Sequence, residues 1–163
     1  MVWEGSDNRS SFTDHRALSH RALLPSETIM KSLVADPAKC TGAMKCVPAC
    51  SQQIFKVTDE AWSSIRVKRA DGKWEFTICD QCGDCIPVCP TKALQRTKAG
   101  VVVVKKDLCV GCFMCIGFCP KAAMFRGPKA TEPFKCLSCN ACVKACPTGA
   151  LKLEERDDTN LPR

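Results

Sequence analysis

The sequence contains no tyrosine, only two histidines and 6% aromatic residues. No basic segment is interleaved with aromatic residues, which argues against recognition of nucleic acid by base stacking. No glycine-rich loop follows an apolar strand, so a nucleotide phosphate site of the usual kind is not expected. No grouping of serine, histidine and acidic residues suggests an acyl-transfer triad, and no apolar stretch approaches the length of a membrane span. The composition therefore offers no obvious substrate chemistry.

Residues 1–31 contain no cysteine and differ from the rest of the chain. They lack the apolar core of a secretory signal and the adjacent arginine pair of a twin-arginine signal, and their acidic residues argue against an organellar transit peptide. A cytoplasmic location is therefore expected. Two interpretations of this arm stay open, namely a segment that orders on a partner and a solvated tail. Its histidines, His15 and His20, fit an exposed structural role better than a metal site.

Cysteine is the residue that the sequence has in abundance, with 15 among 163 residues. Three runs share the spacing C-x2-C-x2-C-x3-C, and each is followed by proline. These runs are Cys79, Cys82, Cys85 and Cys89; Cys109, Cys112, Cys115 and Cys119; and Cys136, Cys139, Cys142 and Cys146. An odd cysteine count and closely spaced thiols argue against a disulfide framework, and zinc sites make no use of a third and fourth cysteine in one run. The spacing is that of the bacterial ferredoxin motif for a [4Fe-4S] cluster.

The spacing also has a mechanical meaning. The first three thiolates of a run wrap one face of a cluster, while the N–H groups of the loop stay free to face the sulfurs. The fourth cysteine ligates the cluster of another run, so the runs act in pairs. The proline suits the first turn of a helix, which predicts short helices at 90–94 and 147–151.

The segment Cys40–Cys50 is a fourth copy with one ligand missing. Cys46 keeps the frame, but Ala43 stands in place of the second cysteine and Ser51 in place of the proline. An alanine methyl cannot coordinate, so the iron facing it must bind water or hydroxide, take a ligand from elsewhere, or be lost to leave a [3Fe-4S] core. An empty, decayed site is the further alternative. Retention of the other cysteines favours an occupied site, because unligated thiols are open to oxidation. We number the runs in chain order, so that 40–50 is the first and 136–146 the fourth.

The formal charge of +7 counts every cysteine as neutral. Metal-bound thiols are deprotonated, so the thiolates and the cores of four clusters together would add roughly −8. The loaded protein would then be close to neutral. We interpret the basic residues as counter-charge for buried anionic clusters and as docking surface.

Short strands and loops are expected around the runs. The patterns predict strands at 32–35, 64–69, 73–78, 101–104 and 150–154. Asp71-Gly72 lies between the second and third of these, which predicts a hairpin. The link between the third and fourth runs is rich in Pro and Lys and is expected to be irregular loop. Phe55, Trp62 and Trp74 are expected to fill a small core near the clusters, a partner-facing patch being the alternative.

The four runs resemble those of the four-cluster, ferredoxin-like subunits of molybdenum and tungsten oxidoreductases. The resemblance covers about residues 30–155, and it rests on the runs, on the hairpin between the first two, and on the segment ACVKACPTGAL at 141–151. The compact fourth run leans toward the subunits that accompany tungsten aldehyde oxidoreductases and benzoyl-coenzyme A reductases. The resemblance implies an α+β fold of two bacterial-ferredoxin-like dicluster modules. They are nested, with the first run paired to the fourth and the second to the third, and short strands and helices surround the clusters.

The same resemblance implies the ligand sets. One cluster takes Cys79, Cys82, Cys85 and Cys119, and its mate takes Cys109, Cys112, Cys115 and Cys89. Another takes Cys136, Cys139, Cys142 and Cys50. The last site is left with Cys40, Cys46 and Cys146, and Ala43 departs from the pattern there.

The expected organisation is an arm at 1–31, a polyferredoxin domain at 32–155 and a tail at 156–163. Within the domain, the outer module combines 32–58 with 132–155, the inner module spans 77–131, and the hairpin insert spans 59–78. Three [4Fe-4S] clusters and the three-cysteine site would be its cofactors.

Two functions stay open. The first is a non-catalytic electron-transfer subunit that relays single electrons between a catalytic subunit and a further redox subunit or carrier. The second is a free polyferredoxin or a scaffold that carries clusters. A subunit needs docking surfaces, which the arm and the hairpin insert could supply, whereas a free carrier needs neither. No nucleic acid and no membrane span are expected in either case.

Overall fold

The computed structural model describes residues 29–157, and within them all the elements are short. The strands are β1 (Ile29–Ala35), β2 (Arg66–Ala70), β3 (Lys73–Thr77), β4 (Leu94–Arg96), β5 (Val102–Val104), β6 (Met124–Arg126), β7 (Pro133–Lys135) and β8 (Leu151–Asp157). The α-helices are α1 (Cys46–Phe55), α2 (Met114–Gly117) and α3 (Ala141–Ala145), and the 3-10 turns are η1 (Pro37–Lys39), η2 (Glu60–Trp62) and η3 (Lys106–Leu108). The strands form four two-stranded antiparallel sheets, so the α+β class expected from the sequence is confirmed.

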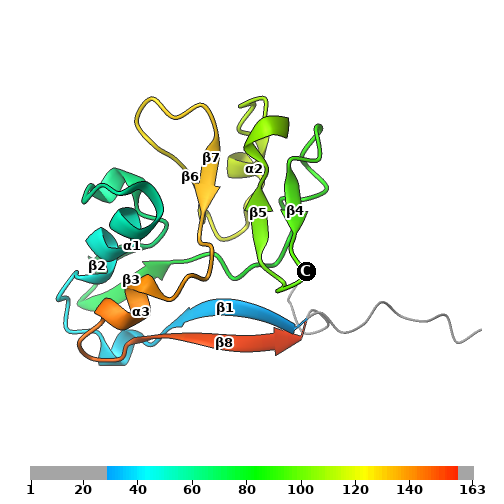
Figure 1. Ribbon diagram of the computed structural model, residues 1–163. Coiled ribbons are helices and arrows are strands. Elements are labelled where there is room, and N and C mark those ends of the chain that lie inside the picture. The colour runs from blue at the N-terminus through cyan, green and yellow to red at the C-terminus, as the bar shows by residue number, and fades with distance from the viewer. Residues whose placement is uncertain (1–28, 158–163) are drawn as a thin grey trace, which may run out of the picture.

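The sheet β1–β8 joins the two ends of the described chain. Its register runs from Ile29 opposite Asp157 to Ala35 opposite Leu151. Figure 1 shows the two strands, blue and red, side by side along the lower edge of the molecule. Both predicted strands are confirmed, the first beginning at Ile29 rather than at residue 32. Because the first run follows β1 and the fourth run precedes β8, this sheet holds those two runs together.

The predicted hairpin is confirmed as β2–β3, with Val67 opposite Phe76 and Ala70 opposite Lys73. Both turn residues have positive φ, 50° at Asp71 and 78° at Gly72. This is the left-handed backbone of a two-residue turn whose twist matches that of the flanking strands.

The second and third runs are separated by the hairpin β4–β5, whose second strand confirms the predicted valine strand. The irregular loop expected between the third and fourth runs is wrong, because β6 and β7 pair there. The strands are too short to leave a periodic signal, and Pro133, a residue that usually argues against a strand, begins β7.

The helices predicted after the prolines are also wrong. The chain turns after Pro90 and Pro147 and then enters β4 and β8. Lys92 has φ 55° and Gly149 has φ 63°, and such left-handed residues stop a right-handed helix. The helices lie instead within the runs, where α2 and α3 contain the third cysteine and end just before the fourth, and α1 contains Cys46 and Cys50.

The buried core is unusual because much of it is sulfur. Seven of the twenty buried apolar residues among those described are cysteines. One core cluster gathers Leu33, Ile65 and Leu151 with thiols of the first, second and fourth runs, and the other gathers Leu94, Val102 and Met124 with Cys85 and Cys115. The apolar side chains therefore pack directly around the runs.

The three aromatic residues expected in the core divide into two groups. Trp74 is half-buried against the first core cluster, as expected. Phe55 and Trp62 belong to neither cluster. They pack with Phe134, at ring-centroid distances of 4.9 Å and 5.9 Å, and line an open cavity of about 610 Å³. For these two rings the core prediction is wrong, because they pack on Phe134 and not among the residues that surround the thiols.

Candidate iron–sulfur sites

The loops of all four runs have the same backbone shape. In each, the second and fourth residues after the first cysteine have positive φ. These residues are Gly42 and Met44, Gln81 and Gly83, Gly111 and Phe113, and Ser138 and Asn140. Alternation of left- and right-handed residues makes a concave nest of N–H groups that suits an anion. The first run keeps this shape although Ala43 replaces its second cysteine.

Most of these left-handed residues are not glycine, so the loops store backbone strain. Strain of about 1–3 kcal/mol at one residue persists only where the surrounding structure fixes it, and it gathers at functional sites. Gly42, Gly83, Gly111 and Asn140 carry a sequence signal for this shape, whereas Met44 and Phe113 do not.

The structure gathers the second and third runs around two cavities. One is lined by Cys79, Cys82, Cys85 and Cys119. The other is lined by Cys109, Cys112, Cys115 and Cys89. In both, the last cysteine of one run faces the first three of the other.

The first and fourth runs meet in the same way. Cys40, Cys46 and Cys146 line one cavity together with Ala43. Cys136, Cys139 and Cys50 are the cysteines whose charges act most strongly on Cys142, and Cys50, Cys136 and Cys142 pack in one core cluster. The thiols that sequence reasoning grouped thus lie near one another in all four cases.

Backbone N–H groups already point at the sulfurs. The N–H two residues after the first cysteine donates to its sulfur, from Gln81 to Cys79 at 3.4 Å and from Ser138 to Cys136 at 3.3 Å. The N–H groups of Ala93, Ala123 and Ser64 donate to Cys89, Cys119 and Cys50, each at 3.3 Å. Such bonds favour the thiolate over the thiol.

Burial works in the opposite direction. It raises the pKa of Cys82 and Cys142 to about 12 and that of Cys85, Cys115 and Cys136 to about 11. Closely spaced buried thiols cannot all ionise in a low-dielectric site unless a cation balances them. A metal supplies that cation and deprotonates its ligands outright.

The last cysteines of the second and fourth runs differ from the buried ones. Burial tends to raise the pKa of both thiols, but hydrogen bonds outweigh this effect. At Cys89 these bonds come from Thr91 and nearby N–H groups, and at Cys146 they come from Thr148 and nearby N–H groups. In both runs the threonine follows the proline, and its Oγ1 lies 3.6 Å from the sulfur. The net pKa of each thiol is therefore lowered.

These features fit a polynuclear group. Among residues 29–157, no three Cys, His, Asp or Glu side chains converge closely enough to hold a single metal ion. The thiols instead surround cavities, with N–H groups directed at their sulfurs, as an iron–sulfur cluster requires.

Sequence reasoning missed a buried polar network beside these sites. Gln81 is fully buried, and its Nε2 donates to the carbonyl of Cys136 at 2.9 Å and to Oγ of Ser138 at 3.2 Å. Its Oε1 accepts from the N–H of Val102 at 3.1 Å and from Nζ of Lys135 at 2.5 Å. The network ties the second loop to the fourth. Gln81 lies between two cysteines of the second run and Lys135 precedes the fourth run, but the spacing of the cysteines says nothing of either residue.

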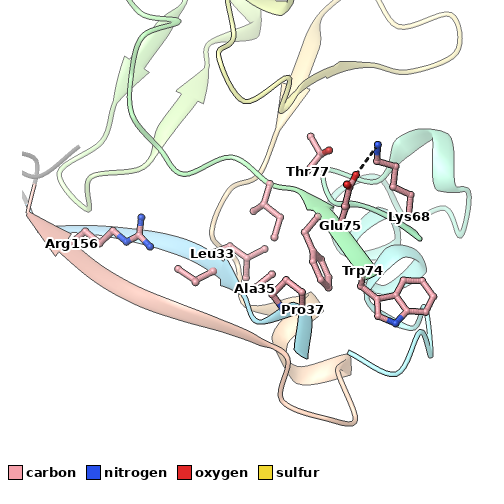
Figure 2. Close-up of a pocket in the computed structure, with 11 residues that line it drawn as sticks. Leu33, Ala35, Pro37, Lys68, Trp74, Glu75, Thr77 and Arg156 are labelled. Carbon is pink, nitrogen blue, oxygen red and sulfur yellow. Dashed lines mark ion pairs between the residues drawn. The ribbon is translucent and has the colours of Figure 1, made fainter. Parts of the chain in front are cut away.

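A separate cavity of about 540 Å³ contains no thiol. It lies between β1 and β3, and Figure 2 shows Leu33 and Ala35 on one side and Trp74 on the other. Lys68 and Glu75 form an ion pair of 2.8 Å at its edge. Its lining residues include no cysteine or histidine and only one carboxylate, Glu75, so this cavity offers no donor set for a metal and the candidate chemistry stays with the runs.

The helices of the described residues are all too short to cross a lipid bilayer. Models of the 4Fe-4S dicluster domain match residues 78–123 and residues 101–147, which together contain the second, third and fourth runs.

Individual proteins match over more of the sequence. The sequence is 35% identical over 147 residues to the B subunit of polysulfide reductase from Wolinella succinogenes, and the match covers 77% of this protein and 76% of that one. It is 36% identical over 150 residues to protein NrfC of Escherichia coli strain K12, covering 78% of this protein and 66% of that one. Among solved structures, a chain of the active-site complex BamBC of benzoyl coenzyme A reductase, in complex with benzoyl-CoA, also matches. The sequences are 24% identical and the TM-score is 0.44, and the match covers 79% of this protein and 81% of that chain. This structural match supports no conclusion about function. The chain therefore belongs to the family of non-catalytic iron–sulfur electron-transfer subunits of molybdenum and tungsten oxidoreductase complexes.

Proposed function

We propose that this chain relays single electrons between a catalytic molybdenum or tungsten subunit and a further redox subunit or carrier, through four iron–sulfur sites in a row. The observation that carries this proposal is the gathering of the four runs into four adjacent thiol groups. When bound, each cluster supplies one-electron chemistry. The chain itself supplies the thiolates, the N–H donors and the low-dielectric surroundings.

The effects of the thiols on one another support one order of the sites. Burial is the largest cause that raises the pKa of Cys85, Cys136 and Cys142, and the charge of a thiol from a neighbouring site adds to it. Those neighbouring thiols are Cys115, Cys79 and Cys46 respectively. We infer a row that runs from the third-run site to the second, then to the fourth and finally to the first.

We further propose the nested arrangement of two modules, with the ligand sets and domain limits expected from the sequence. The outer module is supported by the β1–β8 sheet and by the contact of α1 with α3. The inner module is supported by the match of residues 78–123 to one dicluster domain. The narrower type, a subunit of the tungsten aldehyde oxidoreductase or benzoyl-coenzyme A reductase kind, rests on the compact fourth run alone. The cytoplasmic location stays a prediction.

The first-run site is proposed to hold a [3Fe-4S] cluster. Besides its three cysteines, the cavity is lined by Ala43, Met44, Phe76 and other residues, none of them a carboxylate or an imidazole. No carboxylate or imidazole therefore lines this cavity that could act as a fourth ligand. The loop nevertheless keeps the backbone of the complete runs, with φ 78° at Gly42 and 54° at Met44.

The variant Ala43→Cys tests this site. It should convert the three-iron cluster into a four-iron one, so the electron paramagnetic resonance signal of the oxidised protein should disappear and iron should rise by about one per chain. Iron for only three [4Fe-4S] clusters, with no signal in the oxidised native protein, would show that the site is empty.

The function is tested by anaerobic purification of the native protein with identification of the proteins that co-elute. We expect a larger molybdenum- or tungsten-containing subunit in the complex, and reduction of the clusters when its substrate is added. Migration of the chain alone at its monomer mass would favour a free polyferredoxin instead.

A further inference from the structure

Lys135 is a buried cation that the cysteine motifs do not explain. It ends β7 and precedes Cys136, and only 3% of the residue is exposed. Its Nζ donates to Oε1 of Gln81 at 2.5 Å, to the carbonyl of Val102 at 2.8 Å and to that of Cys136 at 3.4 Å. All three acceptors are neutral, and no carboxylate of the described residues forms an ion pair with it.

A buried ammonium without an anion is costly, because neutral hydrogen bonds replace only part of its hydration. Anionic groups are available on both sides of Lys135 once the thiols bind metal. The side chain lines the cavity of Cys79, Cys82, Cys85 and Cys119. The backbone of its own neighbour, Cys136, begins the fourth-run loop.

The electrostatics agree with this placement. Burial is the main influence on the Cys79, Cys85 and Cys136 thiols and raises their pKa, and the charge of Lys135 opposes it at all three. Among the described lysines and arginines, Lys135 is the one buried beside thiols of both modules.

We propose that Lys135, at the junction of the two modules, tunes the reduction potentials of the clusters on either side of it. Its fixed positive charge would hold the reduction potentials of the second-run and fourth-run sites higher than a neutral side chain would. Reduction adds a negative charge to a cluster, and a nearby cation in a medium of low dielectric constant stabilises that charge. This inference rests on the proposed ligand sets.

The test is a redox titration of the purified protein, followed by electron paramagnetic resonance, for Lys135→Met. We expect the potential of at least one cluster to fall, with its reduction equilibrium weakened about tenfold or more, which is about 59 mV for a one-electron couple. Lys135→Arg, which keeps the charge, should restore most of the potential.

Lys121→Met is the matched control. Lys121 lines the same second-run cavity but is exposed, so water and salt screen its charge. Its removal should shift the reduction equilibrium far less than the removal of Lys135. Equal shifts in the two variants, or unchanged potentials in Lys135→Met with full iron content, would overturn the proposal.

Loss of clusters from Lys135→Met would leave the potential unmeasured, so a second variant is needed. Gln81→Glu places a carboxylate against Nζ, keeps the lysine, and should lower the potential in the same direction. If both variants lose iron, Lys135 is a structural residue and the proposal fails. Iron and sulfide analysis of the native protein reports separately on the ligand sets.

Discussion

Gly83 shows how closely a cysteine loop is fitted to its surroundings. Its φ is 93°, and a Cβ added there would lie 2.5 Å from Nη2 of Arg96. That guanidinium donates to the carbonyls of Gln81 and Gly100 at 3.0 Å and 2.8 Å and to that of Cys82 at 2.9 Å. The absence of a side chain at residue 83 is therefore what lets Arg96 hold the second-run loop.

Replacement of this glycine should be costly. We expect Gly83→Ala to lower the free energy of unfolding by about 1–3 kcal/mol, from backbone strain and from displacement of Arg96. Gly72→Ala is the control, because its φ of 78° is similar but nothing lies within 4 Å of an added Cβ. Anaerobic thermal unfolding of the two iron-loaded variants measures the difference. Equal loss in both would mean that Arg96 adjusts freely.

At this scale the sequence predicted the thiols but not the groups that support them. Every candidate cysteine could be identified because its spacing repeats. Gln81 and Lys135 could not, because a single buried amide and a single buried ammonium have no periodicity, and these two residues bond to each other across 54 positions in the sequence. Their burial depends on how the second-run loop meets the fourth-run loop, which no local pattern encodes.

The β2–β3 hairpin covers part of the first-run site, a role that was not predicted from the sequence. Phe76 lines the first-run cavity, and a Cβ at Gly42 would overlap the indole of Trp74. The hairpin therefore covers the incomplete run, whether or not it also meets a partner.

Removal of this cover should expose the first-run site. We expect Trp74→Ala to speed several-fold the loss in air of the signal of the proposed three-iron cluster, because water and oxygen reach the cluster more easily. Trp62→Ala is the control, since its ring packs with Phe55 and Phe134 and lines a different cavity. The decay of the oxidised signal is the measurement. The same decay rate in both variants would contradict the covering role.

The arm expected at residues 1–31 lies outside the described residues except for its last three, which begin β1. Met30 is fully buried and its sulfur accepts from Arg96 at 2.6 Å, so a truncation must spare it. We expect deletion of residues 1–28 to weaken binding to the catalytic subunit while the iron content stays the same. Co-purification measures this, and an undiminished complex would show that the arm does not dock.

The strands were easier to predict than the helices for a physical reason. Alternation around Asp71-Gly72 and the valines of β5 leave a local signal. Proline at the first turn also suits a helix, but here it is followed by left-handed residues such as Lys92, which turn the chain so that the N–H of Ala93 donates to the sulfur of Cys89. This contact with the sulfur lies outside the local pattern that favours a helix.

For the molecule as a whole, the thiols are a large part of the core. Without metal, the seven buried cysteines would leave closely spaced polar sulfurs and strained loops with little apolar surface to offset them. We expect removal of iron by a chelator under oxidising conditions to abolish cooperative unfolding. Circular dichroism and calorimetry of the apo-protein measure this. A sharp melting transition in the apo-protein would show that the fold stands without its clusters.

The pairing of β1 with β8 also affects when each cluster can be assembled while the chain is being synthesised. Cys40 and Cys46 leave the ribosome early, but the thiol that shares their cavity, Cys146, is made about a hundred residues later, a wait on the order of ten seconds at about 5–20 residues per second. The second and third runs are complete before then. The two sites that the second and third runs share can therefore be loaded during translation. The first-run thiols stay unprotected until the fourth run is made, and oxidative damage to the newly made chain should concentrate on them.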